Sequence, residues 1–264
     1  MKQTPKVLIL RTAGTNCDYE TGYAFEKAGA KVDIVHINAL LANKKLLGEY
    51  QILAIPGGFT YGDDVSAGKI LANQIKYHLE EDIRAFILEK KLILGICNGF
   101  QVLMKAGLLP SITHSDQGAT LTFNDSHKFE DRWVYLEVCS STSPFIHNGH
   151  ASRMYLPVAH GEGKFVTKDE GVLNRIIANR QIVFKYVNAQ GEEAGYPWNP
   201  NGSVENIAGI CDTTGQILGM MPHPERYVEP TQHPCWTRSN RLRDWGDGLS
   251  IFKNAVNYAK STFS

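Results

Sequence analysis

The stretch LILGICNGFQVLMKAGLLP, residues 92–110, changes character in its middle. It begins with the apolar run Leu92–Ile96, and after a corner at Cys97 its apolar residues recur at helical spacing. A short apolar run that passes directly into an amphipathic helix is typical of one strand–helix unit of a parallel sheet. Cys97 has a glycine two residues away on each side, so it is either a small filler in a tight turn or a nucleophile held up to a substrate.

The first hundred residues repeat this alternation of short apolar runs and helical patterns. The predicted strands are Lys6–Leu10, Lys31–Ile37, Tyr50–Ile55 and Lys91–Ile96, and the predicted helices are Asp18–Gly29, Asn98–Ala106 and one or two within Ser66–Lys90. The alternation predicts a mostly parallel sheet covered by helices on both faces. Ligands of such a sheet bind beyond the carboxyl ends of its strands, so the loops Arg11–Asn16, Pro56–Asp64 and the corner at Cys97 should meet at one edge.

The second half of the chain has strand patterns with no long helix between them. The predicted strands are Leu121–Phe123, Arg132–Val138, Arg153–Val158, Ile182–Val187, Ile207–Cys211 and Ile217–Met220. Turn residues separate them, which favours an antiparallel extension of the same domain over a second domain. Gly248–Lys260 has the pattern of a closing amphipathic helix, and Trp236–Asp247 is predicted to be loop.

Size and composition limit the classes of function. The 264 residues suit one large domain, and a hydrophobic content of 43% predicts a packed core. Lys plus Arg and Asp plus Glu number 27 each, so nothing argues for a nucleic-acid or anionic-membrane surface. No apolar run approaches the roughly 18 residues of a membrane span. The first run, Val7–Leu10, is too brief for the core of a signal peptide.

The five cysteines have scattered spacings and form no C-x-x-C motif; they are Cys17, Cys97, Cys139, Cys211 and Cys235. A disulfide framework or a zinc cage is therefore not expected, and a reducing cytoplasm is the simpler setting.

The Gly95-x-Cys97-x-Gly99 pattern has the form of a nucleophile elbow. The amino end of a helix favours negative charge, and hence a thiolate, and its free N–H groups can receive a developing oxyanion. A base for this thiol is offered by His223 in the segment GMMPHPERYV, which follows a predicted strand. In an extended H-P-E segment Glu225 would point the same way as His223 and could hold its ring in one tautomer. The alternative is a proline-rich turn with an incidental histidine.

The segment PGGFTYGD, residues 56–63, is the third chemical element. Its adjacent glycines, Gly57 and Gly58, allow backbone N–H groups to approach a ligand closely and to form an oxyanion hole with the N–H of Asn98. A phosphate-binding loop is the competing interpretation, but neither of the usual glycine-rich phosphate motifs is present. A simple tight turn is the other alternative.

Together these motifs resemble the class I (triad) glutamine amidotransferases. GTNCD at 14–18, PGGFTYGDD at 56–64, GICNGFQVL at 95–103, AHGEGKF at 159–165, NPNGS at 199–203 and the segment ending in GQILGMMPHPER at 226 are similar to the glutaminase components of phosphoribosylformylglycinamidine synthase. The resemblance spans about residues 7–228 and implies a flavodoxin-like open sheet with an antiparallel β extension. It also implies one type 1 domain over residues 1–264, with a C-terminal extension after about residue 228.

The resemblance implies a role for each matching residue. Cys97 would attack the carboxamide of glutamine, His223 would protonate the leaving ammonia and then activate water, and Glu225 would orient His223. The N–H groups of Gly58 and Asn98 would form the oxyanion hole.

The residues implied in glutamine binding are Gly57, Gln101, His160, Gly161 and Gly163. Cys17 lies in the first loop and could be near the implied site, but a small buried cysteine is the favoured expectation.

The resemblance implies no cofactor and no metal in this chain, because ATP and Mg²⁺ would belong to a larger synthetase subunit that uses the ammonia. It leaves open whether the complex includes a small accessory subunit. The alternatives are the same chemistry serving another synthetase, a cysteine peptidase or γ-glutamyl hydrolase that needs no partner, and an inactive scaffold.

Overall fold

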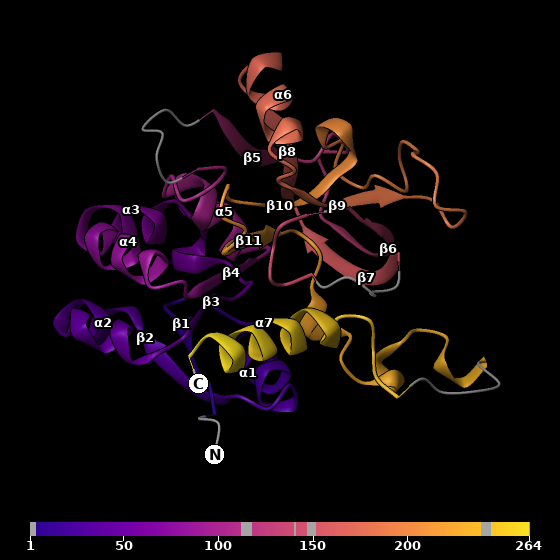
Figure 1. The fold of residues 1–264 in the computed structure, drawn as a ribbon. Helices are drawn as coiled ribbons and strands as arrows, with labels where there is room; N and C mark the ends of the chain where they lie inside the picture. The colour runs from indigo at the N-terminus through magenta and orange to yellow at the C-terminus, as the bar shows by residue number, and fades with distance from the viewer. Residues whose placement is uncertain (1–3, 112–117, 140, 147–151, 239–243, 264) are drawn as a thin grey trace.

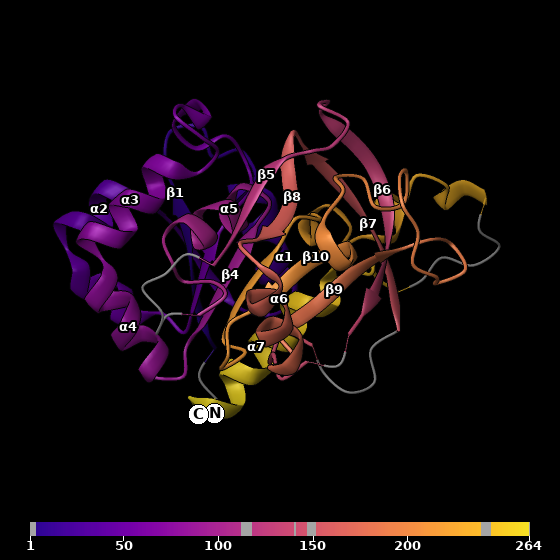
Figure 2. The ribbon, with the colours of Figure 1, turned by 90° about the horizontal axis from the view of Figure 1, so that it is seen from above.

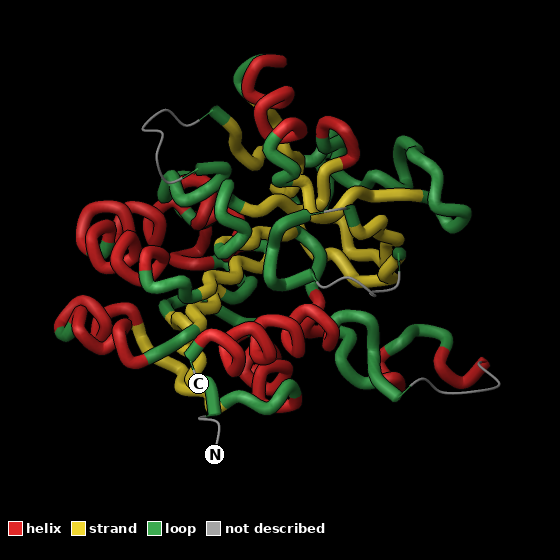
Figure 3. The backbone as a smooth tube through the Cα atoms, in the orientation of Figure 1, coloured by secondary structure: helices red, strands yellow, loops and turns green. Residues whose placement is uncertain are grey.

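The structure is a computed structural model, and it describes residues 4–111, 118–139, 141–146, 152–238 and 244–263. Within these residues a nine-stranded sheet has the order β2-β1-β3-β4-β11-β10-β9-β6-β7, and a two-stranded sheet pairs β5 with β8. In Figure 3 the strands run through the middle of the molecule, and most of the helical turns gather around one half of the sheet.

The first five strands of this order run parallel to one another and the last four are antiparallel to their neighbours. The parallel strands are β1 (Lys6–Arg11), β2 (Lys31–His36), β3 (Ile52–Ile55), β4 (Leu92–Ile96) and β11 (Ile217–Met220). The antiparallel strands are β10 (Ile207–Cys211), β9 (Ile182–Val187), β6 (Glu130–Val138) and β7 (Arg153–His160). The small sheet consists of β5 (Ala119–Phe123) and β8 (Glu162–Thr167).

Helices cover both faces of the parallel strands. These helices are α1 (Asp18–Lys27), α2 (Ile37–Ala42), α3 (Lys69–His78), α4 (Glu80–Leu88), α5 (Asn98–Lys105) and α7 (Leu249–Thr262). The helix α6 (Glu170–Ala178) packs instead against β8 of the small sheet. Figure 1 shows α1 and α7 on one side of the parallel strands and α3, α4 and α5 on the other. Figure 2 shows the parallel half, in indigo and purple, beside the antiparallel half. The predicted α/β architecture is confirmed.

The central strands consist of the aliphatic runs that the sequence predicts. Every residue of β3, β4 and β11 is buried. Strands buried on both faces must be apolar throughout, because helices or loops exclude water from each face.

The strand β11 comes from near the end of the chain but lies in the centre of the sheet. It pairs in parallel with β4, with Met220 opposite Ile96. Because the carboxyl ends of parallel neighbours lie at the same edge, the residues that follow these two strands, Cys97 and His223, are brought to one edge of the sheet.

The structure has elements that the sequence patterns did not predict. The helix α6 lies in the half that was expected to have no long helix; the Asp169 carboxylate accepts a hydrogen bond from the Val172 N–H at 2.8 Å and caps it. Val172 and Ile176, four residues apart, are its buried residues. The strand β8 and the short helix α2 were also not predicted, and Ser66–Lys90 forms two helices, α3 and α4.

The segment after residue 228 returns to the parallel half. Phe252 of α7 packs edge-on against Phe25 of α1, with ring centroids 4.9 Å apart. Of Trp236–Asp247, predicted as loop, Trp236–Arg238 forms a short 3-10 turn and residues 239–243 lie outside the described residues. In the described part of the chain, no helix has both the length and the apolar character needed to cross a membrane.

Candidate active site

Cys97 lies on a strained corner between β4 and α5. Its φ of 50° and ψ of −106° are unusual for a residue with a side chain, and such strain is concentrated at functional sites. A Cβ on Gly99 would lie 1.9 Å from the carbonyl oxygen of Ile55, and one on Gly95 would lie 2.7 Å from the carbonyl oxygen of Gly99. Both flanking positions must therefore be glycine for the helix to approach the sheet so closely.

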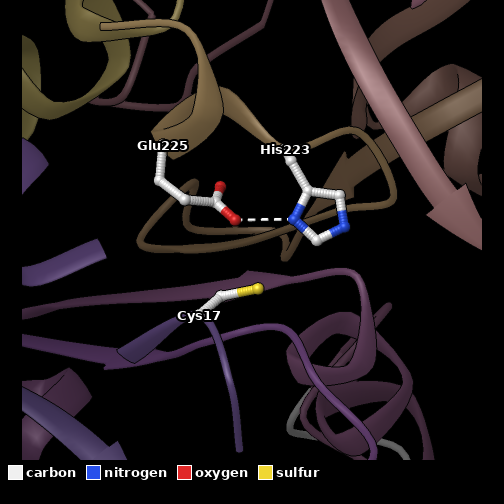
Figure 4. Close-up of side chains that lie close together, drawn as sticks. All are labelled: Cys17, His223 and Glu225. Atoms are coloured by element: carbon white, nitrogen blue, oxygen red, sulfur yellow. Dashed lines mark hydrogen bonds and ion pairs between the residues drawn. The ribbon is translucent and has the colours of Figure 1, made fainter. Parts of the chain in front are cut away.

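His223 and Glu225 form a buried pair beside this corner. The Nδ1 atom of His223 lies 2.6 Å from Oε1 of Glu225 (Figure 4). The segment is not extended as predicted: Pro224–Arg226 forms a 3-10 turn, and this turn brings the carboxylate back to the ring. The His223 N–H donates to the carbonyl oxygen of Pro157 in β7 at 2.8 Å, so the antiparallel half holds the backbone of His223 in place.

The surroundings of His223 favour its protonated form. Burial acts to lower the pKa of His223, but the Glu225 carboxylate and then the Cys97 thiol outweigh it, so the pKa lies well above its ordinary value. Among the described residues no group reaches hydrogen-bonding geometry with Nε2 of His223. This nitrogen is therefore free to exchange a proton with a reacting group.

Gly57 is the point at which the thiols and the imidazole meet. A Cβ on Gly57 would lie 2.8 Å from Cε1 of His223, 3.2 Å from Sγ of Cys17 and 3.5 Å from Cβ of Cys97. The absence of a side chain here lets these three residues come together. The carbonyl oxygen of Gly57 also accepts hydrogen bonds from the N–H groups of Asn16 and Cys17.

The three loops that were predicted to meet do so. Gly58 forms an isolated bridge with Thr15 of the first loop. Its φ is 146°, and a Cβ added to it would lie 2.6 Å from the carbonyl oxygen of Gly14, so there is no room for a side chain. The side chain of Asn98 joins the second loop to α5, since its Oδ1 accepts from the Thr60 N–H at 3.2 Å.

A small cavity of about 170 Å³ opens at Cys97. Five predicted site residues line it: Gly58, Cys97, Gln101, His160 and Gly161. The other predicted residues, Gly57, Asn98, Gly163, His223 and Glu225, are not among its lining residues. A larger cavity of about 400 Å³, beyond the other end of α5, contains none of the predicted residues.

Gln101 is held on both sides of its amide. Its Nε2 donates to the carbonyl oxygen of Glu162, and its Oε1 accepts from Nδ2 of Asn98 at 2.9 Å. It thus links α5 to the start of β8 at the wall of the cavity.

His160, at the end of β7, is a second buried histidine in this site. Its Nδ1 lies 3.1 Å from Oδ1 of Asn124. Burial, and after it the nearby His223, lowers the pKa of His160 to about 3, so the ring stays neutral. Gly163 packs against the ring, where a Cβ would lie 2.5 Å from it.

Two residues of the site were not predicted to belong to it. Asn124 connects His160 to the N–H of Gly163, and a single asparagine in a turn gives no signal of this role. Cys17 was expected to be a small buried cysteine; it is buried, and it also lies against the His223–Glu225 pair. Among the described residues, Cys17, His223 and Glu225 are the one group of three such side chains whose donor atoms are close enough together to hold a metal ion.

Comparisons with known proteins agree with this geometry. A model of the CobB/CobQ-like glutamine amidotransferase domain matches residues 4–259. The chain is 50% identical over 256 residues to phosphoribosylformylglycinamidine synthase subunit PurQ of Dehalococcoides mccartyi, covering 97% of this chain and 98% of that one. It is 44% identical over 271 residues to the subunit of the same name from Methanococcus maripaludis, covering 98% of each chain.

Solved structures show the same fold. A chain of the structure of PurLQS from Thermotoga maritima has a TM-score of 0.73 and 31% identity, over 97% of this chain and 99% of that chain. A glutamine amidotransferase from Thermotoga maritima, at 16% identity and a TM-score of 0.52 over 99% and 95% of the two chains, shares the fold alone.

Proposed function

The chain belongs to the CobB/CobQ-like glutamine amidotransferase family, and on this premise we propose that it is the glutaminase subunit of phosphoribosylformylglycinamidine synthase. In this role it hydrolyses L-glutamine to glutamate and ammonia, and the ammonia converts formylglycinamide ribonucleotide to formylglycinamidine ribonucleotide in de novo purine synthesis. The relatives of that name support this choice, because each is matched over nearly its whole length. One observation carries the proposal: a thiol on a strained strand–helix corner lies beside a buried histidine–carboxylate pair.

The first step forms a thioester. The Cys97 thiolate attacks the carboxamide carbon of glutamine, and the tetrahedral intermediate places its negative charge on the former carbonyl oxygen. His223, whose raised pKa keeps it protonated at neutral pH, gives its proton to the departing amine, and ammonia leaves. Glu225 holds the ring by Nδ1, so the proton is delivered from Nε2.

The second step releases glutamate. The imidazole of His223 is now neutral and takes a proton from water, which attacks the thioester carbonyl. The bond to Cys97 breaks, glutamate forms, and the thiolate and the imidazolium are restored.

The oxyanion of both steps is assigned to two backbone N–H groups. Asn98 is the first residue of α5, where helix N–H groups have no partner within the helix. Gly58 lines the cavity together with Cys97, in a backbone conformation that glycine adopts readily. Each donor of this kind lowers the barrier by about 3 kcal/mol in enzymes that use it.

The cavity residues are assigned to glutamine binding. Gln101, His160 and Gly161 line the cavity beside Cys97 and could contact the α-amino and carboxylate groups of the substrate. Gly57 and Gly163 act indirectly, because each makes room for a histidine ring.

The partner is assigned as the large ATP-dependent subunit, which would hold ATP and Mg²⁺. The name PurLQS of the solved Thermotoga assembly further supports a small accessory subunit. A stand-alone hydrolase is the competing function, and it would be fully active without any partner.

Replacement of the nucleophile tests the proposal. In the reconstituted complex, Cys97→Ala should lower glutamine-dependent synthesis on the order of 10⁴-fold or more, while ammonium should still support synthesis. Cys211→Ala, which removes a buried thiol far from His223, is the matched control and should retain activity. If Cys97→Ala keeps glutamine-dependent activity, or if the isolated wild-type chain is fully active, the assignment is wrong.

A further inference from the structure

Cys17 is a buried thiol that the proposed mechanism does not use. It immediately precedes α1, and its sulfur faces the His223 ring and the Glu225 carboxylate (Figure 4). The donor atoms of Cys17, His223 and Glu225 lie within 4.8 Å of one another. The exposed fractions of the three residues are 0%, 2% and 1%, so the cluster is shielded from bulk water.

We propose that Cys17, His223 and Glu225 form a binding site for a borderline-soft divalent cation such as Zn²⁺, and that an ion bound there stops glutamine hydrolysis. The binding part of this inference stands on the geometry alone. The inhibitory part rests on the proposed function.

The donor set selects the class of cation. One sulfur, one imidazole nitrogen and one carboxylate oxygen are ligands that Zn²⁺ accepts together, whereas Mg²⁺ and Ca²⁺ prefer oxygen ligands throughout. Zinc ligands at bond lengths of about 2.0–2.3 Å lie roughly 3.5 Å apart around a tetrahedral ion. Since the three donor atoms already lie within 4.8 Å of one another, movements of about an ångström would bring them onto one ion.

The charges of the site suit a divalent ion. A thiolate and a carboxylate together would balance its charge, and Oε2 of Glu225 is buried with no hydrogen-bond partner among the described residues. The Arg226 guanidinium opposes the cation, but its Nη2 lies 3.2 Å from Sγ of Cys17, where it can donate to a metal-bound thiolate as an outer-shell group. Glu20, 3.3 Å from Nε of Arg226, offsets part of that positive charge.

Binding at this site would remove the acid–base function of His223. The cation would replace the proton shared by Nδ1 and Glu225, so the ring would lose the carboxylate that orients it. Because a cysteine binds a metal ion as its thiolate, Cys17 must release its proton when the ion binds. Because the three residues are buried, the ion must enter through local opening, and inhibition should develop slowly.

Cadmium binding to a chain without the nucleophile tests the site directly. Cd²⁺ is the probe because a cadmium–thiolate bond has a charge-transfer absorption. The background is the full chain carrying Cys97→Ala and Cys235→Ala, which removes the nucleophile and the exposed thiol. This chain should bind one equivalent of Cd²⁺ with the thiolate absorption. Adding Cys17→Ser should abolish it, whereas adding Cys211→Ala should not.

Inhibition of the active enzyme tests the consequence. Zn²⁺ should inhibit the wild-type glutaminase progressively, and Cys17→Ser should raise the half-inhibitory concentration by about tenfold or more, the lower bound expected for loss of a ligand. If Cys17→Ser fails to fold, Glu225→Gln in the cadmium background is the second variant, and it should weaken Cd²⁺ binding. The site is refuted if the absorption survives removal of Cys17, or if zinc inhibits both enzymes equally. The cadmium readout needs no activity, so failure of the proposed function would leave it unaffected.

Discussion

The antiparallel and parallel halves of the sheet each supply one buried histidine near Cys97, and the two rings differ in charge. His223 follows the parallel strand β11 and faces a carboxylate at 2.6 Å, which raises its pKa despite burial. His160 ends the antiparallel strand β7 and faces the neutral amide of Asn124 at 3.1 Å, and burial lowers its pKa to about 3.

This comparison separates the effect of burial from the effect of the partner. The exposed fractions of His160 and His223 are 3% and 2%, so desolvation opposes the charged form of both. Each ring also has a glycine against it, Gly163 for His160 and Gly57 for His223. The largest difference is the partner of Nδ1, a carboxylate for His223 and an amide for His160, with the Cys97 thiol adding to the effect at His223.

Removal of each ring should produce the largest contrast. His223→Asn should lower kcat for glutamine hydrolysis by about 10³-fold, because the general acid is lost. His160→Asn should act mainly on KM, with kcat falling by less than about tenfold, because a neutral ring can bind substrate but not supply the proton. Steady-state kinetics of the reconstituted complex measure both, and equal losses of kcat would contradict the contrast.

Exchange of the two Nδ1 partners, Glu225 and Asn124, for the other type of side chain should lower the proton affinity of His223 and raise that of His160. Glu225→Gln should bring the pKa of His223 down from its raised value and lower kcat by about 10²-fold. Asn124→Asp places a carboxylate beside His160 and should raise the pKa of that ring.

Titration of the two imidazoles by nuclear magnetic resonance measures these shifts. Urea denaturation of each variant is the control, because Asn124 also donates to the carbonyl oxygens of Lys128 and His160. If neither ring responds to the exchange, burial and not the partner sets their charge.

The smallest effect is a pH dependence of stability. Between its ordinary pKa of about 6.5 and about 3, His160 binds a proton in the unfolded chain but not in the folded one, so the free energy of unfolding falls as the pH falls. His160→Asn lacks this linkage, so its stability relative to wild type should rise by about 1 kcal/mol for each pH unit from pH 6 to 4. Urea denaturation at several pH values measures the difference, and parallel curves of stability against pH would contradict it.

The pH dependence that His223 gives to stability has the opposite sign. Its contribution to the free energy of unfolding is complete below its ordinary pKa and is lost as the pH rises through its raised pKa in the folded chain.

The sequence predicts the parallel half and the closeness of the proposed catalytic residues Cys97, His223 and Glu225, because both depend on local patterns. Aliphatic runs define β1, β3 and β4, and the glycines around Cys97 are required by contacts that the elbow pattern already implies. The helix α6 was missed although Asp169, Val172 and Ile176 give it a cap and an apolar face.

The rest of the site depends on contacts between distant segments. Cys17 meets His223 only because the first loop crosses the end of β11, and Asn124 meets His160 only through the pairing of β5 with β8. No periodicity of the sequence encodes either contact. Even the predicted His223–Glu225 pair is formed by a turn and not by the extended geometry expected for it.

The place of β11 between β4 and β10 has a consequence for the chain while it is being synthesised. The strand β4, which leads to the proposed nucleophile Cys97, is synthesised in the first half of the chain, and β11, which leads to the proposed base His223, follows only near the end. Until then β4 has an unpaired edge where β11 will lie, and a nascent chain has a thiol but no imidazole to use with it. If the proposed roles hold, a translation product that stops before β11 cannot hydrolyse glutamine, because the last parallel strand to be made is the one that leads to His223.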